Sequence, residues 1–508
     1  MNRRKKIGTF LLVFSILLFV GSCSFLVYYL LLQPNHSKKV QDKYKDIYYS
    51  DEAIYDSEAE SRIQTATDEE DNNIVTSPSF DISLDQGFKR GAKDKNGILK
   101  KFNRLLEYNP DVKGWISISD TCIDYPVLQN NSIDYYLDKD FDGNKDKNGS
   151  LYIDEHSTIN SDCKNIVIHG HNMFSTGMMF YQLPQYKNVE FYREHPIITF
   201  DTLYNESQWK IFAYMIVYGN PQVNDGFNYM QGYFDSTEEF NEFLYQIELR
   251  SPYYCPVDVN ENDTLLMLST CTGELNNGRG VVVARKVRED ESPDVNTSLS
   301  YEKENVLYPT AWYSQYGGEA PLVSDFATAL SFNEINWYDG EVEPVSLEGT
   351  IVEDDNFTYQ LTSPTTADLI SCKNKKATQL KIPDTVSYLD RDINVTYALA
   401  KSFSGMKKLE KLTINNEITT IPDRAYTECP NLKTVIIGKS VQSIGFKAFF
   451  GLDNLTNVII KSETLEEIEP KAFGKILCTF KIKEDFNQEY KSLIEESGID
   501  ENCKFKQN

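Results

Sequence analysis

The sequence predicts a mainly β protein in three parts: a β-barrel with helical insertions, a C-terminal repeat solenoid and a single N-terminal transmembrane helix. Three observations predict these parts. Short runs of β-branched and aromatic residues recur from residue 109 to residue 288. Apolar residues recur with a fixed spacing near the C-terminus. An uncharged stretch follows a basic N-terminus. At 508 residues the chain is long enough for two or three domains.

The N-terminus predicts a membrane anchor. Residues 1–6 form a basic tail, and residues 7–32 carry no charge and are long enough to cross a bilayer as a helix. Because a basic flank stays in the cytoplasm, we expect a single-pass protein of the cell membrane with its later domains extracellular. The residues ending at Cys23 resemble a lipoprotein cleavage site. The apolar run continues to residue 32, which favours an uncleaved anchor over lipidation or a cleaved signal peptide.

Residues 33–98 are predicted to be an acidic stalk or linker, because this segment is polar and poor in apolar periodicity. The whole chain has 76 acidic and 51 basic residues and a formal net charge of −25. Phosphate binding needs basic patches, so this balance argues against a nucleic acid as a partner.

Residues 99–288 are predicted to form one domain built on a barrel. A helix is expected near residues 99–106, and the apolar spacing over residues 237–249 predicts another, with Ser236 or Thr237 as its cap. Strands dominate the rest, which indicates a β-barrel with insertions. The predicted strands are residues 115–118, 123–128, 150–153, 165–169, 197–200, 209–217, 264–269 and 280–286.

Polar groups with catalytic chemistry stand at the ends of three of these strands. Cys271 closes one apolar run, Arg279 opens the next, and the segment 169–172, His-Gly-His-Asn, follows an earlier run. Strand ends on a rigid sheet can aim such groups at one point. Cys and His together support nucleophilic acyl transfer, and Arg can stabilise an oxyanion. From the residues alone, His156, His169, His171 and His195 remain about equal as the base.

The nine cysteines are scattered and contain no Cys-x-x-Cys pair, so neither a zinc site nor a dithiol redox motif is supported. We therefore expect no metal and no cofactor. The spacing does not reveal a disulfide framework, and most of these thiols are interpreted as buried apolar groups.

The C-terminal part repeats every 23 residues. Leu409, Leu432 and Leu455 recur with this spacing, as do other apolar positions. This period predicts a leucine-rich-repeat solenoid over residues 357–508, with residues 485–503 as a terminal cap. The segments 422–426 and 445–449 resemble the bacterial BspA-type repeat. Residues 289–356 are a linker or unassigned region. Because they contain Trp312 and Trp337, we expect them to be more than a pure linker and to pack on a neighbouring part, but the sequence assigns them no fold.

Taken in order, the motifs of residues 109–288 resemble those of a class B sortase. The resemblance implies a membrane-anchored transpeptidase in which Cys271 is the nucleophile, His171 the general acid and base and Arg279 the oxyanion stabiliser. It also implies that Ser269 contacts the peptide substrate. Met267 departs from the Thr that many sortases carry. The matching motifs are residues 109–116, 124–127, 169–173 and 268–271, and Arg279 with residues 281–284.

The resemblance also implies partners. The substrates would be surface proteins with a C-terminal sorting motif, and the acceptor an amine of cell-wall peptidoglycan or a pilin lysine. The repeats would bind a protein or cell-wall ligand. Two alternatives stay open: a surface adhesin whose sortase-like block is inactive, and a cysteine peptidase that hydrolyses rather than transfers.

Overall fold

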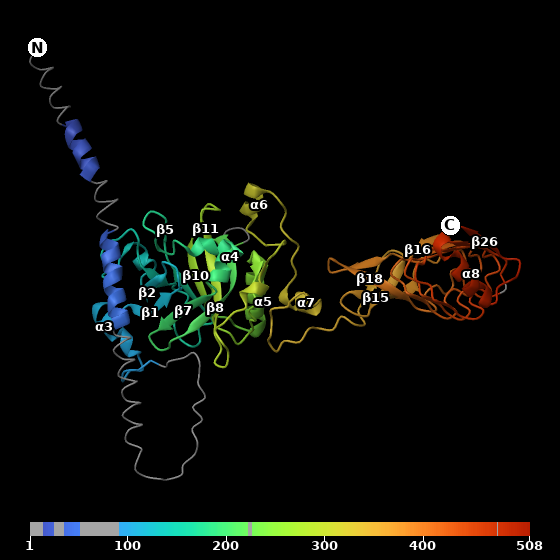
Figure 1. Cartoon of the computed structure of the whole chain (residues 1–508), viewed down its shortest axis with the longest axis horizontal. Coiled ribbons are helices and arrows are strands. Elements are labelled where there is room, and N and C mark those ends of the chain that lie inside the picture. Colours follow the sequence, from blue (N-terminus) through green and yellow to red (C-terminus); the bar gives the residue numbers. More distant parts are fainter. Residues whose placement is uncertain (1–13, 25–34, 51–90, 222–225, 475, 508) are drawn as a thin grey trace, which may run out of the picture. The chain divides into compact units, whose positions relative to one another are not determined.

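The computed structural model describes residues 14–24, 35–50, 91–221, 226–474 and 476–507. The chain forms two compact units, each considered by itself. The barrel unit runs to Phe326 and includes Trp337–Val342. The repeat unit comprises Ala327–Asn336 and Glu343–Asn508. Figure 1 shows the strands of the barrel unit in cyan to yellow-green and the repeats in orange and red.

The predicted transmembrane span lies partly outside the described residues. Its described part, residues 14–24, is helical. Among the helices that the structure describes, none combines the length and the apolar character that a bilayer span needs.

Residues 35–50 form a helix packed on the barrel, so the predicted stalk is wrong for this segment. Tyr44 and Tyr48 are buried, and the Tyr48 ring stacks on Trp115 at 4.4 Å between ring centroids. The Tyr48 hydroxyl donates a hydrogen bond to Asp201 at 2.7 Å. Val40, Tyr44 and Tyr48 are four residues apart and share one helix face, a periodicity that the polar composition concealed. The rest of the stalk, up to residue 90, lies outside the described residues.

Eight strands close into the barrel in the order β1-β2-β3-β4-β10-β11-β8-β7. All eight strands predicted from the sequence are found in it. The parallel pairing of β4 with β10 brings Ile168 beside Leu268, one hundred residues away along the chain. The strands are β1 Val112–Ser117, β2 Asp124–Leu128, β3 Leu151–Ile153, β4 Asn165–His169, β7 Ile197–Thr202, β8 Gln208–Tyr218, β10 Leu265–Cys271 and β11 Gly278–Lys286.

Helices and short two-stranded sheets surround the barrel (Figure 1). The predicted helix near residue 237 is α5, Thr237–Arg250, and the Ser236 hydroxyl accepts from Glu239 N as its N-cap. The helix predicted before the first strand is η2, Lys100–Phe102, followed by α3, Asn103–Tyr108. The remaining elements are β5 Asn172–Met173, β6 Met178–Met179, β9 Tyr253–Tyr254, β12 Tyr301–Glu302, α4 Val189–Glu194, α6 Thr310–Tyr316, η3 Tyr135–Asp138, η4 Leu183–Lys187 and η5 Thr297–Leu299.

The barrel unit extends beyond the boundary predicted at residue 288. Glu291 forms ion pairs with Arg285 and Lys210, both at 2.6 Å. Lys303 pairs with the carboxylate of Glu248, which is only 6% exposed. A buried carboxylate without its cation is costly, so these contacts attach the segment after residue 288 to the barrel unit, as its aromatic residues suggested.

The repeat unit begins with a five-stranded sheet of order β13-β14-β15-β18-β17. It occupies most of residues 351–398, so the first part of the solenoid predicted from residue 357 forms this separate sheet instead. Most strand pairs in this sheet are antiparallel. Strand β16 lies between β15 and β17 in the chain but pairs with β19 of the repeats that follow. Its strands are β13 Ile351–Glu353, β14 Phe357–Leu361, β15 Thr366–Cys372, β17 Thr385–Tyr388 and β18 Arg391–Ala398. Helix α7, Phe326–Ser331, precedes this sheet in the chain and begins at Phe326, which still belongs to the barrel unit.

The repeats themselves form two parallel sheets, of orders β16-β19-β21-β23-β25-β26 and β20-β22-β24. Register follows the sequence period, because Val435 pairs with Val458. The Phe449 ring stacks between Tyr426 and Phe473, with centroids 5.1 and 5.3 Å away. The elements are β16 Gln379–Lys381, β19 Lys411–Thr413, β20 Thr420–Ile421, β21 Thr434–Ile437, β22 Ser443–Ile444, β23 Asn457–Ile460, β24 Glu467–Ile468, β25 Thr479–Ile482, η6 Glu484–Phe486, α8 Asn487–Glu496 and β26 Lys504–Gln507.

Candidate active site

Cys271 and Arg279 face each other across the β10–β11 hairpin. They are directly paired in the antiparallel register, so their side chains leave the same face of the sheet. Cys271 is an exposed free thiol at the end of β10. The pairing therefore places a nucleophile beside a guanidinium at an accessible edge of the barrel.

The His-Gly-His-Asn segment is hydrogen-bonded to the last three residues of β10. Gly170 N donates to Ser269 O at 3.1 Å, and the Thr270 hydroxyl donates to Gly170 O at 2.7 Å. The Asn172 amide donates to the main-chain carbonyl of Cys271 at 3.2 Å. These bonds flank His171 on both sides and hold it alongside Cys271.

His171 makes one further hydrogen bond that orients its ring. Its Nε2 lies 2.8 Å from the main-chain oxygen of Leu137 in η3. A carbonyl can only accept, so Nε2 carries the hydrogen and Nδ1 is the nitrogen that can exchange a proton. The half-buried imidazole is thus prepared for acid–base chemistry with a fixed tautomer.

Gly170 is required by this packing. A Cβ at this position would lie 2.3 Å from Leu151 Cδ2 and 2.7 Å from Phe180 Cδ2. A side chain at this position would force Leu151, Phe180 or the segment that carries His171 to shift.

The other histidines are held elsewhere. His169 Nε2 is 2.9 Å from one carboxylate oxygen of Asp154, and His156 Nδ1 is 2.8 Å from the other. Burial alone would raise the pKa of Asp154, but the hydrogen bonds from His169 and His156 bring this pKa below its usual value. His195 follows α4 and packs against Phe191. Of the four histidines, His171 is therefore the one the fold places beside Cys271.

Ser269 points to the same face of β10 as Cys271 but is only 1% exposed. Its hydroxyl lies 3.0 Å from the hydroxyl of Tyr229, another buried residue. Direct contact between Ser269 and a peptide therefore stays a prediction. What the structure adds is Tyr229 as a neighbour that Ser269 holds in place.

The Arg279 guanidinium is free to meet an anion. It donates to Gly278 O at 3.2 Å, and no ion pair engages it among the residues that the structure describes. Gly219 leaves room for the group, because a Cβ there would lie 3.1 Å from Arg279 Cζ. A cation not already neutralised is suited to a developing oxyanion.

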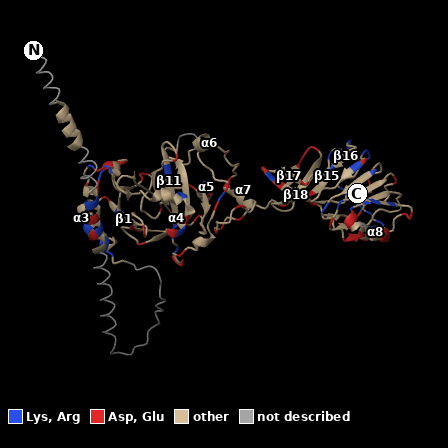
Figure 2. Ribbon diagram, turned by 45° about the horizontal axis from the view of Figure 1, so that its top comes forward, with Lys and Arg blue, Asp and Glu red and all other residues tan. Residues whose placement is uncertain are grey.

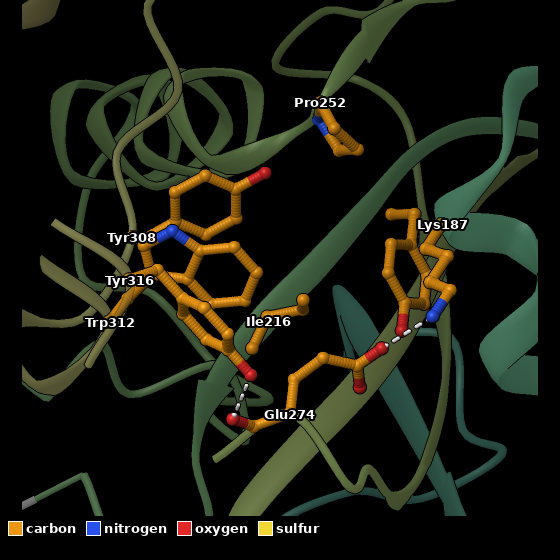
Figure 3. Close-up of a pocket in the computed structure, with 8 residues that line it drawn as sticks. Lys187, Ile216, Pro252, Glu274, Tyr308, Trp312 and Tyr316 are labelled. Carbon is orange, nitrogen blue, oxygen red and sulfur yellow. Dashed lines mark hydrogen bonds and ion pairs between the residues drawn. The ribbon is translucent and has the colours of Figure 1, made fainter. Parts of the chain in front are cut away.

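Behind the hairpin lies a cavity of about 270 Å³ (Figure 3). Ile216 and Tyr214 of β8 line it. Their side chains lie on the opposite face of the sheet from those of Val217 and its cross-strand partner Arg279. Figure 3 shows Tyr308, Trp312 and Tyr316 on one side and Lys187 on the other. The cavity is therefore walled partly by the segment after residue 288.

The cavity wall also holds the loop that follows Cys271. The Tyr316 hydroxyl donates to the main-chain oxygen of Glu274 at 3.0 Å, and the Gln315 amide donates to the same oxygen at 3.3 Å. The Glu274 carboxylate pairs with Lys187 at 2.7 Å. Helix α6 and η4 thus fix the β10–β11 loop from two sides.

Sequence reasoning singled out Cys271, His171 and Arg279, which the fold places on neighbouring segments, but it missed the residues that support them. Asn172 lies within the motif and could have been named as a partner of Cys271. The Leu137 carbonyl, the Tyr229 hydroxyl and the contact of α6 with Glu274 carry no signal in the sequence, because each depends on tertiary packing. No group of three or more His, Cys, Asp or Glu side chains in the described ranges is arranged to hold a metal ion.

Comparison with known proteins gives two family matches. Residues 116–287 match the Sortase domain. Residues 396–505 match the BspA type Leucine rich repeat region, in six copies. Sortase B of Listeria monocytogenes is 34% identical over 179 residues, which are 35% of this chain and 70% of the relative. Sortase B of Staphylococcus aureus is 30% identical over 199 residues, 39% of this chain and 79% of the relative.

Solved structures with similarity include the Staphylococcus aureus sortase B–substrate complex, at 29% identity and a TM-score of 0.34, covering 38% of this chain and 86% of that one. A Clostridium perfringens sortase B structure is 30% identical with a TM-score of 0.34, covering 36% of this chain and 98% of that one.

Proposed function

Because this chain belongs to the sortase family, with sortase B enzymes among its relatives, we propose that it is a class B cysteine transpeptidase of the cell surface. One observation carries the proposal. Cys271 and Arg279 are a cross-strand pair, and hydrogen bonds tie the segment of His171 to the strand of Cys271.

In the first half of the reaction the Cys271 thiolate attacks the carbonyl of a peptide bond. The electron pair moves to the carbonyl oxygen, and the Arg279 guanidinium stabilises the resulting oxyanion. His171 delivers a proton to the leaving amine as the C–N bond breaks. The product is a thioester between the substrate and Cys271.

In the second half an amine attacks the thioester. His171 removes the proton that the amine loses, the tetrahedral oxyanion again meets Arg279, and the thiolate of Cys271 leaves. A new amide joins substrate and acceptor. Water in place of the amine would give the hydrolytic peptidase that we retain as the alternative.

We infer the partners from the family and the sequence. The substrate is a surface protein with a C-terminal sorting motif, cleaved after a Thr as in the family. The acceptor is an amine of cell-wall peptidoglycan or a pilin lysine. Residues 7–32 anchor the enzyme in the membrane, with the catalytic and repeat units outside the cell. The repeats bind a partner or substrate.

Product analysis tests this function. Full-length protein is incubated with a candidate sorting peptide, with and without an amine such as triglycine, and products are identified by mass spectrometry. Transfer predicts a ligated peptide that depends on the amine. Free acid in equal amount with and without amine would support the peptidase instead. No cleavage of any sorting peptide, although hydroxylamine is present to trap a thioester, would favour the inactive adhesin.

A further inference from the structure

One face of the six-stranded repeat sheet carries a concentration of lysines. Along β16, β19, β21, β23, β25 and β26, alternate side chains such as Leu412 and Phe480 enter the core. The intervening positions point outward in two in-register rows across all six strands. We call this surface the lysine face, after Lys381, Lys411, Lys481, Lys504 and Lys506.

The lysine face has no acidic residue. Its twelve outward positions comprise the five lysines, three threonines, two isoleucines, one asparagine and one glutamine. The chain as a whole has 76 acidic and 51 basic residues, so the balance is reversed here. Figure 2 shows blue segments on the strands near β16, whereas red prevails at α8.

The lysines are poorly neutralised by their own neighbours. Lys381 has a 4.0 Å contact with Asp384. Lys411, Lys481, Lys504 and Lys506 form no ion pair with the part of the chain that the structure describes. Lys481 pairs directly with Lys506 in the ladder, and like charges opposite each other on a sheet are destabilising. An anion bound across them would relieve this repulsion.

The arrangement fits a long ligand better than a small ion. Neighbouring strands are about 4.8 Å apart, so six strands extend over about 24 Å. In the row from Lys411 to Lys504, hydroxyl and amide groups lie between the lysines and supply hydrogen-bond donors, whereas the middle of the other row is apolar. The face has no aromatic side chain on which a base could stack, which argues against single-stranded nucleic acid.

We propose that the lysine face binds a linear polyol-phosphate polymer of the cell envelope, along the direction in which the strands stack. The proposal deepens the binding role proposed for the repeats and does not depend on catalysis in the barrel unit. Charge complementarity sets the affinity, so binding weakens as salt increases.

The test uses full-length protein in detergent and a fluorescent poly(glycerol phosphate) of about 20 units, with binding followed by anisotropy. The double variant Lys481→Gln/Lys506→Gln should bind about tenfold more weakly at low salt. The control is Lys447→Gln/Lys471→Gln, which removes the same charge from turns after β22 and β24, away from this face. The control should bind like the unaltered protein.

Three results would overturn the proposal: no binding by the unaltered protein, an equal loss in both double variants, or no loss in either. Tighter binding of an oligodeoxynucleotide with the same number of phosphates would also overturn it, in favour of nucleic acid. Melting curves confirm that both variants fold. Peptide transfer is measured in the same preparations and should be unchanged, so failure of the catalytic proposal is recognised separately.

Discussion

In the barrel unit, residues that act together come from distant parts of the chain, whereas in the repeat unit they come from adjacent repeats. β4 lies beside β10 across one hundred residues, and this pairing joins the segment of His171 to that of Cys271. In the repeats, Val435 lies beside Val458, 23 residues on. The first arrangement converges on one point, and the second spreads equivalent positions over a surface.

This difference has consequences for substitution. A convergent site depends on single atoms, so one change can abolish chemistry without affecting the fold. A periodic unit shares its core and its face among copies, so one core change weakens the fold and one surface change weakens binding only in part. Substitutions in the barrel unit and in the repeat unit should therefore differ in what they impair.

The largest effect is expected from Cys271→Ala. Removing the nucleophile should abolish peptide cleavage and the thioester adduct, because no other thiol is held beside His171 and Arg279 among the described residues. Cys271 is exposed, so melting should be unchanged. Mass spectrometry of peptide and protein checks both products. Cleavage at the original rate by a folded variant would refute the proposed site.

The next effect concerns His171→Ala and Arg279→Ala. Each should lower kcat/KM by a factor on the order of 10² or more, through lost proton transfer or lost oxyanion stabilisation. Steady-state kinetics with a sorting peptide measure it.

The matched control is His169→Ala. His169 bonds to Asp154 and not to the strand of Cys271, so its loss should cost far less activity. An essential His169 with a dispensable His171 would mean that the roles in this segment are assigned wrongly.

A core change in the repeats should show the opposite behaviour. Phe449→Ala removes a fully buried ring from the stack with Tyr426 and Phe473 and should destabilise the repeat unit by about 3–5 kcal/mol. Peptide cleavage should be unaffected.

Fluorescence separates the two units in this experiment. The chain has four tryptophans, Trp115, Trp209, Trp312 and Trp337, and all belong to the barrel unit. Tryptophan-monitored unfolding of Phe449→Ala should match the unaltered protein, while calorimetry shows a transition at lower temperature. A parallel shift in tryptophan fluorescence would show that the units unfold together.

The two units also differ in how far the sequence predicts them. All eight barrel strands and α5 follow from local patterns, and the register of Val435 with Val458 follows from the 23-residue period. The helix over residues 35–50 was missed because four apolar positions are spread among charged ones. The motifs predicted Cys271, His171 and Arg279 as site residues. The hydrogen bond of His171 to Leu137 O could not be predicted, since any residue supplies a carbonyl.

A smaller effect is expected where α6 holds the β10–β11 loop. Tyr316→Phe removes the hydroxyl that donates to Glu274 O and should lower kcat about threefold to tenfold by loosening the loop after Cys271. Tyr301→Phe in β12 is the matched control, since that ring packs on Tyr254 instead. Equal kcat values for both variants would show that the α6 contact does not position the loop.

The smallest effect is a pH dependence of the barrel unit. Burial alone would raise the pKa of Glu291, but hydrogen bonds from Arg285 and Lys210 lower it to about 2. An unfolded glutamate has a pKa of about 4.3, so the folded value is depressed. The stabilisation is fully present above about pH 4.3 and is lost as the pH falls toward 2.

Denaturant unfolding followed by tryptophan fluorescence at several pH values between 6 and 3 measures this loss. Glu291→Gln should be less stable than the unaltered protein at pH 6, and the difference should shrink at pH 3, where the carboxylate has begun to be protonated. Glu304→Gln removes the same charge at an exposed site in the same segment. Its stability difference from the unaltered protein should not change between pH 6 and pH 3. A constant difference between Glu291→Gln and the unaltered protein at every pH would mean that this ion pair does not attach the segment after residue 288 to the barrel.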